Sequence, residues 1–199
     1  MIIMGIDPGI AIVGYGIVDY KNPRFTTLAH GAVTTRAGLE VERRLEIIYD
    51  ELDTLFKTYR PDAVAVEELF FNTNHTTAIP VAEARGTILL CARKNGVTIA
   101  EYTPLQVKSA VVGYGRADKK QVIAMTRDIL GLKVMPKLDD TADALAIAVC
   151  HAHSAASRVS QYYNKPLDRS AVSNAGAKTD GGYTLEQLLA REHKPRGQK

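Results

Sequence analysis

Residues 2–20 read IIMGIDPGIAIVGYGIVDY, and this stretch sets how the fold begins. Residues 2–7 are a short apolar run rich in β-branched side chains, which predicts a strand. The run ends in Asp7-Pro8-Gly9, a sequence typical of a turn. Residues 13–20 are predicted to form a second strand. We interpret three glycines here as a tight hairpin-like return between the strands: Gly9, Gly14 and Gly16.

Further segments follow in an order that defines the fold class. Residues 26–35 are predicted as a third strand, and short turns between three successive strands predict an antiparallel meander. The apolar run 63–66, which leads into Glu67, is typical of a central strand covered on both faces. A fifth strand is predicted at 97–102. Helices are predicted at 39–59, 76–94, 104–112, 118 or 119 to 130, and 139 to about 157. This order predicts an α/β protein with a mixed five-stranded sheet and helices on both faces.

The composition is that of an ordinary globular protein. The chain has 199 residues, of which 46% are hydrophobic and 24% charged, so it can bury the core of one domain. No apolar run approaches the roughly 20 residues that span a bilayer, and the first residues lack a basic signal segment. The two cysteines, Cys91 and Cys150, are expected to be free thiols in a reducing compartment. These features predict a cytoplasmic protein without membrane contact.

Charge is distributed unevenly along the chain. Residues 40–68 carry nine acids and four bases, whereas residues 85–137 carry ten bases and three acids. The basic region suits a polyanion such as nucleic acid, although solvated helix faces produce similar runs. The composition changes after residue 158: Ser, Asn, Gly and Lys dominate residues 170–182, and residues 158–199 carry eight bases and four acids. We therefore predict one domain at 1–157 and a basic, disordered tail at 158–199.

Four carboxylates occupy positions from which they can meet in one cleft. Asp7 and Glu67 each end an apolar strand, and strand ends border the ligand crevice of open α/β sheets. Asp140 and Asp143 are three residues apart in a predicted helix, so they share one face. Such a cluster needs cations, and hard oxygen ligands suit Mg²⁺ or Mn²⁺. A pair of these ions activates a water and stabilises the leaving oxygen in phosphodiester hydrolysis.

Each acid also has a purely structural interpretation when it is taken alone. Asp7 suits a turn, and Glu67 and Glu68 suit the polar end of a strand. Asp139 and Asp140 are good residues for a helix N-terminus. The combination of two strand-end acids with a helical Asp-x-x-Asp is what favours a metal site.

Six short motifs occur in a fixed order along the chain: Gly5-Ile6-Asp7-Pro8-Gly9, Gly14-Tyr15-Gly16, Val66-Glu67 followed by Phe70, Gln106-Val107-Lys108, Val111-Val112-Gly113, and Asp140-Thr141-Ala142-Asp143-Ala144-Leu145-Ala146. In these motifs and their order, the sequence resembles the bacterial RuvC Holliday-junction resolvases over about residues 1–157. The resemblance implies a ribonuclease H-like fold with a catalytic, metal-binding site made of Asp7, Glu67, Asp140 and Asp143. It implies paired nicks in two strands of a four-way junction, which leave 5′-phosphate and 3′-hydroxyl ends. Glu68 is a weaker candidate for the site.

Partners and DNA contacts are also implied by the resemblance. Symmetric cuts imply a homodimer, with its interface at the helix of residues 76–94, and RuvA and RuvB are the expected branch-migration partners. Lys108 and Lys119 match positions that contact DNA near the scissile phosphate. Arg116 and Lys120 lie beside Lys119 and are further candidates for backbone contacts. Phe70 is expected to stack on an unpaired base, with burial in the core as its alternative.

Other functions remain open from the sequence. Ribonuclease H-like nucleases that process RNA ends begin with a similar Gly-x-Asp-x-Gly. Actin-like and sugar-kinase domains do so too, but they need a second similar domain, for which this chain has no room. A DNA-binding protein without catalysis is a third alternative, and the four acids in register argue against it.

Overall fold

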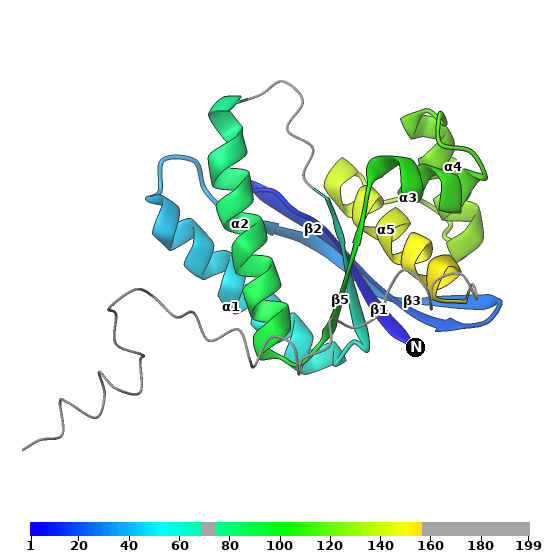
Figure 1. Cartoon of the computed structure of the whole chain (residues 1–199), viewed down its shortest axis with the longest axis horizontal. Coiled ribbons are helices and arrows are strands. Elements are labelled where there is room, and N and C mark those ends of the chain that lie inside the picture. Colours follow the sequence, from blue (N-terminus) through cyan, green and yellow to red (C-terminus); the bar gives the residue numbers. More distant parts are fainter. Residues whose placement is uncertain (69–74, 157–199) are drawn as a thin grey trace, which may run out of the picture. The chain divides into compact units, whose positions relative to one another are not determined.

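The structure is a computed structural model that describes residues 1–68 and 75–156 (Figure 1). Phe70 and the segment predicted as a tail, residues 158–199, lie outside the described residues. Every predicted strand and helix within the described range is present, with ends at most two residues from the predicted ones. Among the described residues, no helix has the length and apolarity needed to cross a membrane.

Five strands form one mixed sheet in the spatial order β3-β2-β1-β4-β5. The strands β1 (Ile2–Asp7), β2 (Ile12–Lys21) and β3 (Arg24–Thr34) are antiparallel neighbours, which confirms the predicted meander. The strand β4 (Ala63–Glu67) lies parallel to β1, and β5 (Thr98–Tyr102) lies parallel to β4. The carboxyl ends of β1 and β4 therefore meet at the same edge of the sheet.

Helices cover both faces of this sheet, as predicted (Figure 1). On one face α1 (Val41–Tyr59) and α2 (His75–Lys94) pack against it, with Ile48, Leu52 and Ile88 fully buried. On the other face α5 (Asp139–Ala156) lies directly on β1 and β2, flanked by α3 (Pro104–Val112) and α4 (Lys119–Leu130). Each face has its own hydrophobic cluster, so the central strands are apolar on both sides.

Glycines in the central strands let α5 approach the sheet closely. A Cβ on Gly5 would lie 2.0 Å from the carbonyl oxygen of Ala144, and a Cβ on Gly14 would lie 2.0 Å from that of Asp140. Gly16 would meet the side chain of Leu145 in the same way. The interpretation of Gly14 and Gly16 as part of a hairpin return is therefore wrong. Both lie inside β2, and the space left by their missing side chains is filled by the alanine-rich helix.

Side-chain caps fix where the two short helices begin. Thr103 forms a capping box with Gln106 at the start of α3, and Asp118 forms one with Gln121 at the start of α4. Each box satisfies two otherwise unpaired backbone N–H groups, so the first turn of each helix is well defined. Lys119 is consequently held as the first residue of α4.

Candidate active site

Asp7 is placed by the strand register at the contact between sheet and helix. In the antiparallel pair, Asp7 lies directly opposite Gly14, whose backbone touches the backbone of Asp140. Side chains alternate along a strand, so Asp7 faces the same side of the sheet as Gly5, which also contacts α5. Asp7 and the first turn of α5 are thus brought together by two positions without side chains.

Glu67 reaches the same place from β4. Ile6 is paired with Val66 in the parallel ladder, so the next residues, Asp7 and Glu67, end neighbouring strands on the same face. From the helix side, the Thr141 hydroxyl donates a hydrogen bond to the Gly31 carbonyl at 3.0 Å and ties the start of α5 to β3. The structure therefore brings together all four predicted acids, Asp7, Glu67, Asp140 and Asp143.

The electrostatics of Asp7 show how closely these acids interact. Its pKa is raised from 3.8 to about 8, first because the carboxyl is buried and then because Glu67, Asp143 and Asp140 repel its charge. Burial, followed by repulsion from Asp143, also raises the pKa of Glu67. Lys119 opposes the rise at both acids, and Lys108 opposes it at Glu67. The two lysines offset the negative charge of the cluster only in part, because the pKa of both acids stays raised.

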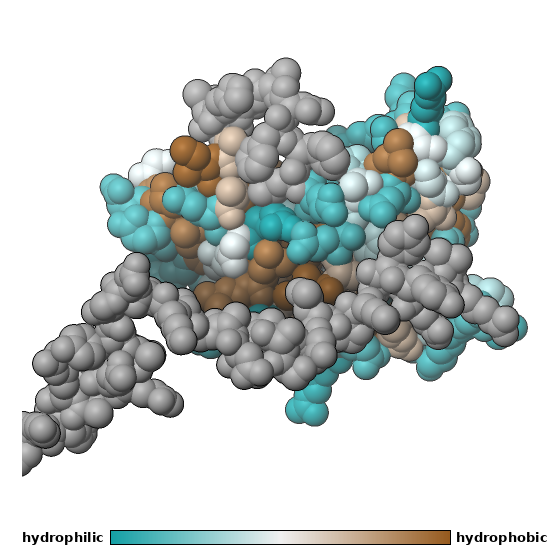
Figure 2. Space-filling view, viewed as in Figure 1, coloured by the Kyte–Doolittle hydropathy of each residue, from teal (hydrophilic) through white to brown (hydrophobic). Residues whose placement is uncertain are grey.

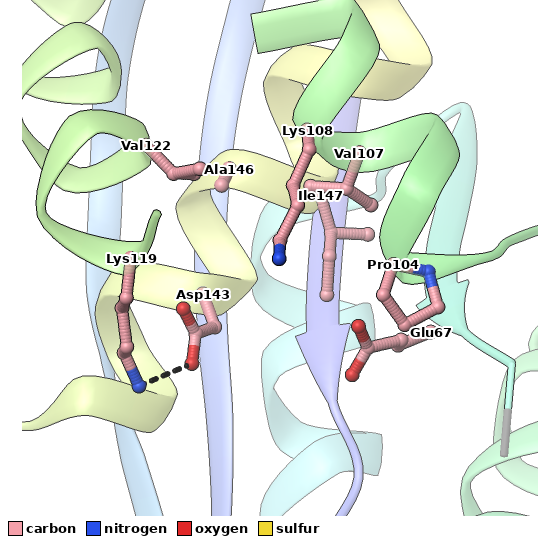
Figure 3. Close-up of a pocket in the computed structure, with 9 residues that line it drawn as sticks. All are labelled: Glu67, Pro104, Val107, Lys108, Lys119, Val122, Asp143, Ala146 and Ile147. Atoms are coloured by element: carbon pink, nitrogen blue, oxygen red, sulfur yellow. Dashed lines mark hydrogen bonds and ion pairs between the residues drawn. The ribbon is translucent and has the colours of Figure 1, made fainter. Parts of the chain in front are cut away.

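A cavity of about 220 Å³ opens beside this cluster (Figure 3). Figure 3 shows Glu67 and Asp143 on opposite sides of it, with Lys108 reaching from α3 into the space between them. Lys119 Nζ donates to Asp143 Oδ2 at 3.0 Å and lies 3.1 Å from Asp139 Oδ2. Two lysines predicted to contact DNA thus belong to the acidic site itself.

The other predicted DNA contacts within the described residues, Lys120 and Arg116, do not line the cavity beside the acids. Lys120, the neighbour of Lys119, lines a separate groove with Arg127 and Lys133 on another side of α4. Arg116 is exposed in the loop between α3 and α4. Phe70 is outside the described residues. Glu68 donates its backbone N–H to Tyr102, and its charge is not among those that raise the pKa of Asp7.

Two features of the site were missed by the sequence analysis. The first is the contact between Asp139 and Lys119, because Asp139 was interpreted only as a helix-capping residue. The second is the apolar wall of the cavity, which consists of Pro104, Val107, Val122, Ala146 and Ile147. Their spacing is that of ordinary core positions on helices, so no sequence signal separated them from the core.

The donor set fits a divalent cation. Every acid supplies oxygen alone, which suits a hard ion, and a cation among the acids would offset the burial and repulsion that raise the pKa of Asp7. Within residues 1–68 and 75–156, no three Asp, Glu, His or Cys side chains converge into a ready-made metal centre. In the metal-free protein Asp143 is instead paired with Lys119, whose Nζ lies 3.0 Å from its Oδ2.

The metal-free protein is expected to lose stability between about pH 4 and pH 8. Because the pKa of Asp7 is raised from 3.8 to about 8, the folded state keeps its proton to higher pH than the unfolded chain does. This contribution is fully present below the unfolded pKa and is lost as pH rises toward the folded pKa. Thermal unfolding in a chelator at several pH values measures it. Asp7→Asn should weaken the pH dependence, and an unchanged dependence would contradict the assignment.

The fold and the four clustered carboxylates define a class of protein, the ribonuclease H-like nucleases that depend on divalent metal ions. The family model described as "Crossover junction endodeoxyribonuclease RuvC" matches residues 3–151. The chain belongs to this RuvC family. The resemblance stated from the sequence and the expected fold are both confirmed.

Relatives and solved structures agree with the family. A RuvC of Clostridioides difficile is 60% identical over 154 residues, which cover 77% of this chain and 91% of the relative. One of Alkaliphilus metalliredigens is 59% identical, covering 77% of this chain and 94% of the relative. The structure of Thermus thermophilus RuvC in complex with a Holliday junction substrate has a TM-score of 0.75 at 40% identity, covering 78% and 94% of the two chains. A yeast mitochondrial Holliday junction resolvase, with a TM-score of 0.57 at 14% identity, covers 76% of this chain and 77% of its own and shares the fold alone.

Proposed function

We propose that this protein resolves Holliday junctions, the four-way DNA junctions of homologous recombination and repair, by paired symmetric nicks. The observation that carries the proposal is the cluster around Asp7, where burial and three further carboxylates raise the pKa of this acid, and where Lys108 and Lys119 line the adjoining cavity. Membership of the RuvC family supports it, as does the Thermus thermophilus relative in complex with a Holliday junction substrate. The products are ends with 5′-phosphate and 3′-hydroxyl groups.

Asp7, Glu67, Asp140 and Asp143 are the residues that would hold the metal. We propose two Mg²⁺ ions in each site, with Mn²⁺ able to substitute. When bound, such ions activate a water and stabilise the leaving oxygen of a phosphodiester. Lys108 and Lys119 bind the phosphate beside the cut and offset its charge. Arg116 and Lys120 bind the backbone further from the cut, and Phe70 stacks on an unpaired base.

Cleavage of a synthetic four-way junction in Mg²⁺, beside a linear duplex and a single-stranded RNA, tests the proposed function. Symmetric nicks in the junction alone are the expected result. Cutting of the RNA instead would move the function to RNA processing with the same fold. Tight junction binding without cutting of any substrate would leave a DNA-binding protein and contradict the proposed catalysis.

A homodimer is part of the proposal, because two symmetric cuts need two sites. The outward face of α2 carries Ile79 (68% exposed), Gly86 and Leu90 (56% exposed) at spacings of seven and four residues, so they share one face. A Cβ on Gly86 would meet nothing within 4 Å, which leaves room for a close helix partner. Hydrophobic side chains show on the surface in the region of α1 and α2 (Figure 2).

Leu90→Glu is expected to convert the dimer into a monomer, because it places a charge in an apolar contact between two copies. Analytical ultracentrifugation of the wild type and the variant measures this change. Lys57→Glu, a charge change on the exposed surface of α1, is the control and should leave the dimer intact. A wild-type protein that sediments as a monomer at micromolar concentration would contradict the proposed dimer.

The basic segment of residues 158–199 is proposed to add sequence-independent DNA affinity outside the nuclease domain of residues 1–157. Each phosphate that a cation neutralises changes the slope of log K against log salt concentration by about 0.9 for duplex DNA. Removal of residues 158–199 should therefore make the salt dependence of junction binding shallower. An identical slope would show that the segment does not contact DNA.

The cellular setting follows from the same function. We propose that the enzyme acts in the cytoplasm, where two free buried thiols suit a reducing environment. RuvA and RuvB are the proposed partners at the junction.

A further inference from the structure

Lys119 is held by two carboxylates at once. Its Nζ lies 3.0 Å from Asp143 Oδ2 and 3.1 Å from Asp139 Oδ2. Asp139 and Asp143 are four residues apart, so they project from the same face of the first turns of α5. The capping box of Asp118 fixes the backbone of Lys119 at the start of α4, which leaves the side chain to be oriented by these two acids.

The two acids differ in their relation to the site. Asp143 lines the cavity and raises the pKa of both Asp7 and Glu67. Asp139 does not line the cavity, and its charge is not among those that raise the pKa of Asp7 or Glu67. It is 71% exposed at its side chain and touches the site only through Lys119. Asp139 therefore lies outside the metal-binding cluster while it contacts the lysine of that cluster.

Under the proposed function, Asp143 takes part in two interactions: it binds the metal and it pairs with Lys119. A carboxylate that serves a divalent cation is less available to an ammonium group, since both compete for its oxygens. Asp139 is not one of the four proposed metal-binding acids, so its oxygens stay available to Lys119. It can keep Lys119 beside the cluster, so that the ammonium stays directed at the phosphate instead of turning into solvent.

We propose that Asp139 is a positioning residue, which acts through Lys119 and does not bind metal. The inference rests on the proposed function for its catalytic consequence, but the contact itself exists in the metal-free protein. An alternative is that Asp139 serves only the N-terminus of α5. Asn caps helices as well as Asp does, so Asp139→Asn keeps the capping ability of the side chain and removes its charge. The loss of the contact with Lys119 is distinguished from the loss of a charge at the helix N-terminus by repeating the substitution without Lys119.

The first experiment measures the contact without metal or DNA. Acetylation of lysines under competing, limiting reagent, followed by mass spectrometry, reports how available each amine is. An ammonium held by two carboxylates reacts slowly, because only the neutral amine is acylated. In Asp139→Asn, the reactivity of Lys119 should rise about two- to fivefold, since an exposed ion pair contributes up to about 1 kcal/mol. Lys57 serves as the internal reference, and Asp128→Asn should leave Lys119 unchanged. Unchanged reactivity of Lys119 in Asp139→Asn would overturn the proposal.

The second experiment is a double-mutant cycle on junction cleavage with saturating protein, so that the rate constant is separated from affinity. Asp139→Asn should lower the single-turnover rate about two- to fivefold, with junction affinity in a chelator unchanged. In the Lys119→Met background, the same substitution should have no effect. Asp139→Glu should restore most of the rate. Equal losses in both backgrounds would overturn the proposal, because Asp139 would then act independently of Lys119. If the wild type cut no junction, the proposed function would fail, and the acetylation result would still decide whether Asp139 holds Lys119.

Discussion

Asp7→Asn is expected to abolish strand cutting while junction binding stays intact. Asp7 lies at the centre of the cluster, and its charge interacts with those of Glu67, Asp140 and Asp143. Loss of the carboxylate removes one of the four side chains that would hold the metal, so the cleavage rate should fall on the order of 1000-fold or more. Binding should persist, because the lysines remain and one repulsive charge near the phosphate is removed.

Cleavage and junction affinity are measured separately for this variant, the latter in a chelator. Asp50→Asn, at an exposed position of α1, is the control with the same chemical change and should cut at the wild-type rate. The metal-free Asp7→Asn protein should also unfold at a higher temperature than the wild type near pH 8, because a buried charge has been removed. Wild-type cleavage by Asp7→Asn would refute the assignment of the site.

Gly14→Ala is expected to have the second largest effect. The added Cβ would lie 2.0 Å from the carbonyl oxygen of Asp140, a backbone atom that can move only if α5 moves. Overpacking of this kind costs about 1–3 kcal/mol, which for a protein of this size lowers the melting temperature by roughly 2–12 °C. The movement also displaces Asp140 from Asp7, so cleavage should fall on the order of 100-fold even where the variant is folded.

Gly16→Ala provides the comparison within the same strand. Its Cβ would press mainly on the side chain of Leu145, at 2.6 Å, which can change rotamer more easily than a helix backbone can shift. We expect a smaller loss of activity from Gly16→Ala than from Gly14→Ala. Thermal unfolding and single-turnover cleavage of both variants test this order. Equal cleavage by Gly14→Ala and the wild type would show that close packing of α5 does not position Asp140.

Local sequence patterns predicted the fold well because they correspond to local structure. The strand of Ile2–Asp7 ends where Asp-Pro-Gly predicted, and the apolar run before Glu67 forms the buried strand β4. The helix of Pro104–Val112 has the bounds that its sequence predicted. The family resemblance added the order of the motifs, which is why all four acids could be named before the structure placed three of them near Asp7.

The remaining features depend on contacts between distant segments. The need for glycine at Gly14 arises from α5, which is more than 120 residues away in the sequence, so turn formation was the only local explanation. Only the family resemblance set Lys119 apart from Lys120, and the structure shows that Lys119 contacts Asp143 whereas Lys120 lines a separate groove. Which of two adjacent lysines faces the acids is decided by the rotation of α4, and a single exposed turn carries no pattern that predicts it.

A crystal soaked in Mn²⁺ and measured at the manganese absorption edge tests the central claim most directly. The account predicts anomalous density among Asp7, Glu67, Asp140 and Asp143, with Asp7 in contact with the metal and with the density lost in Asp7→Asn. Density at exposed acids alone, or none beside Asp7 at millimolar Mn²⁺, would contradict the proposal that these four carboxylates form a metal-dependent nuclease site.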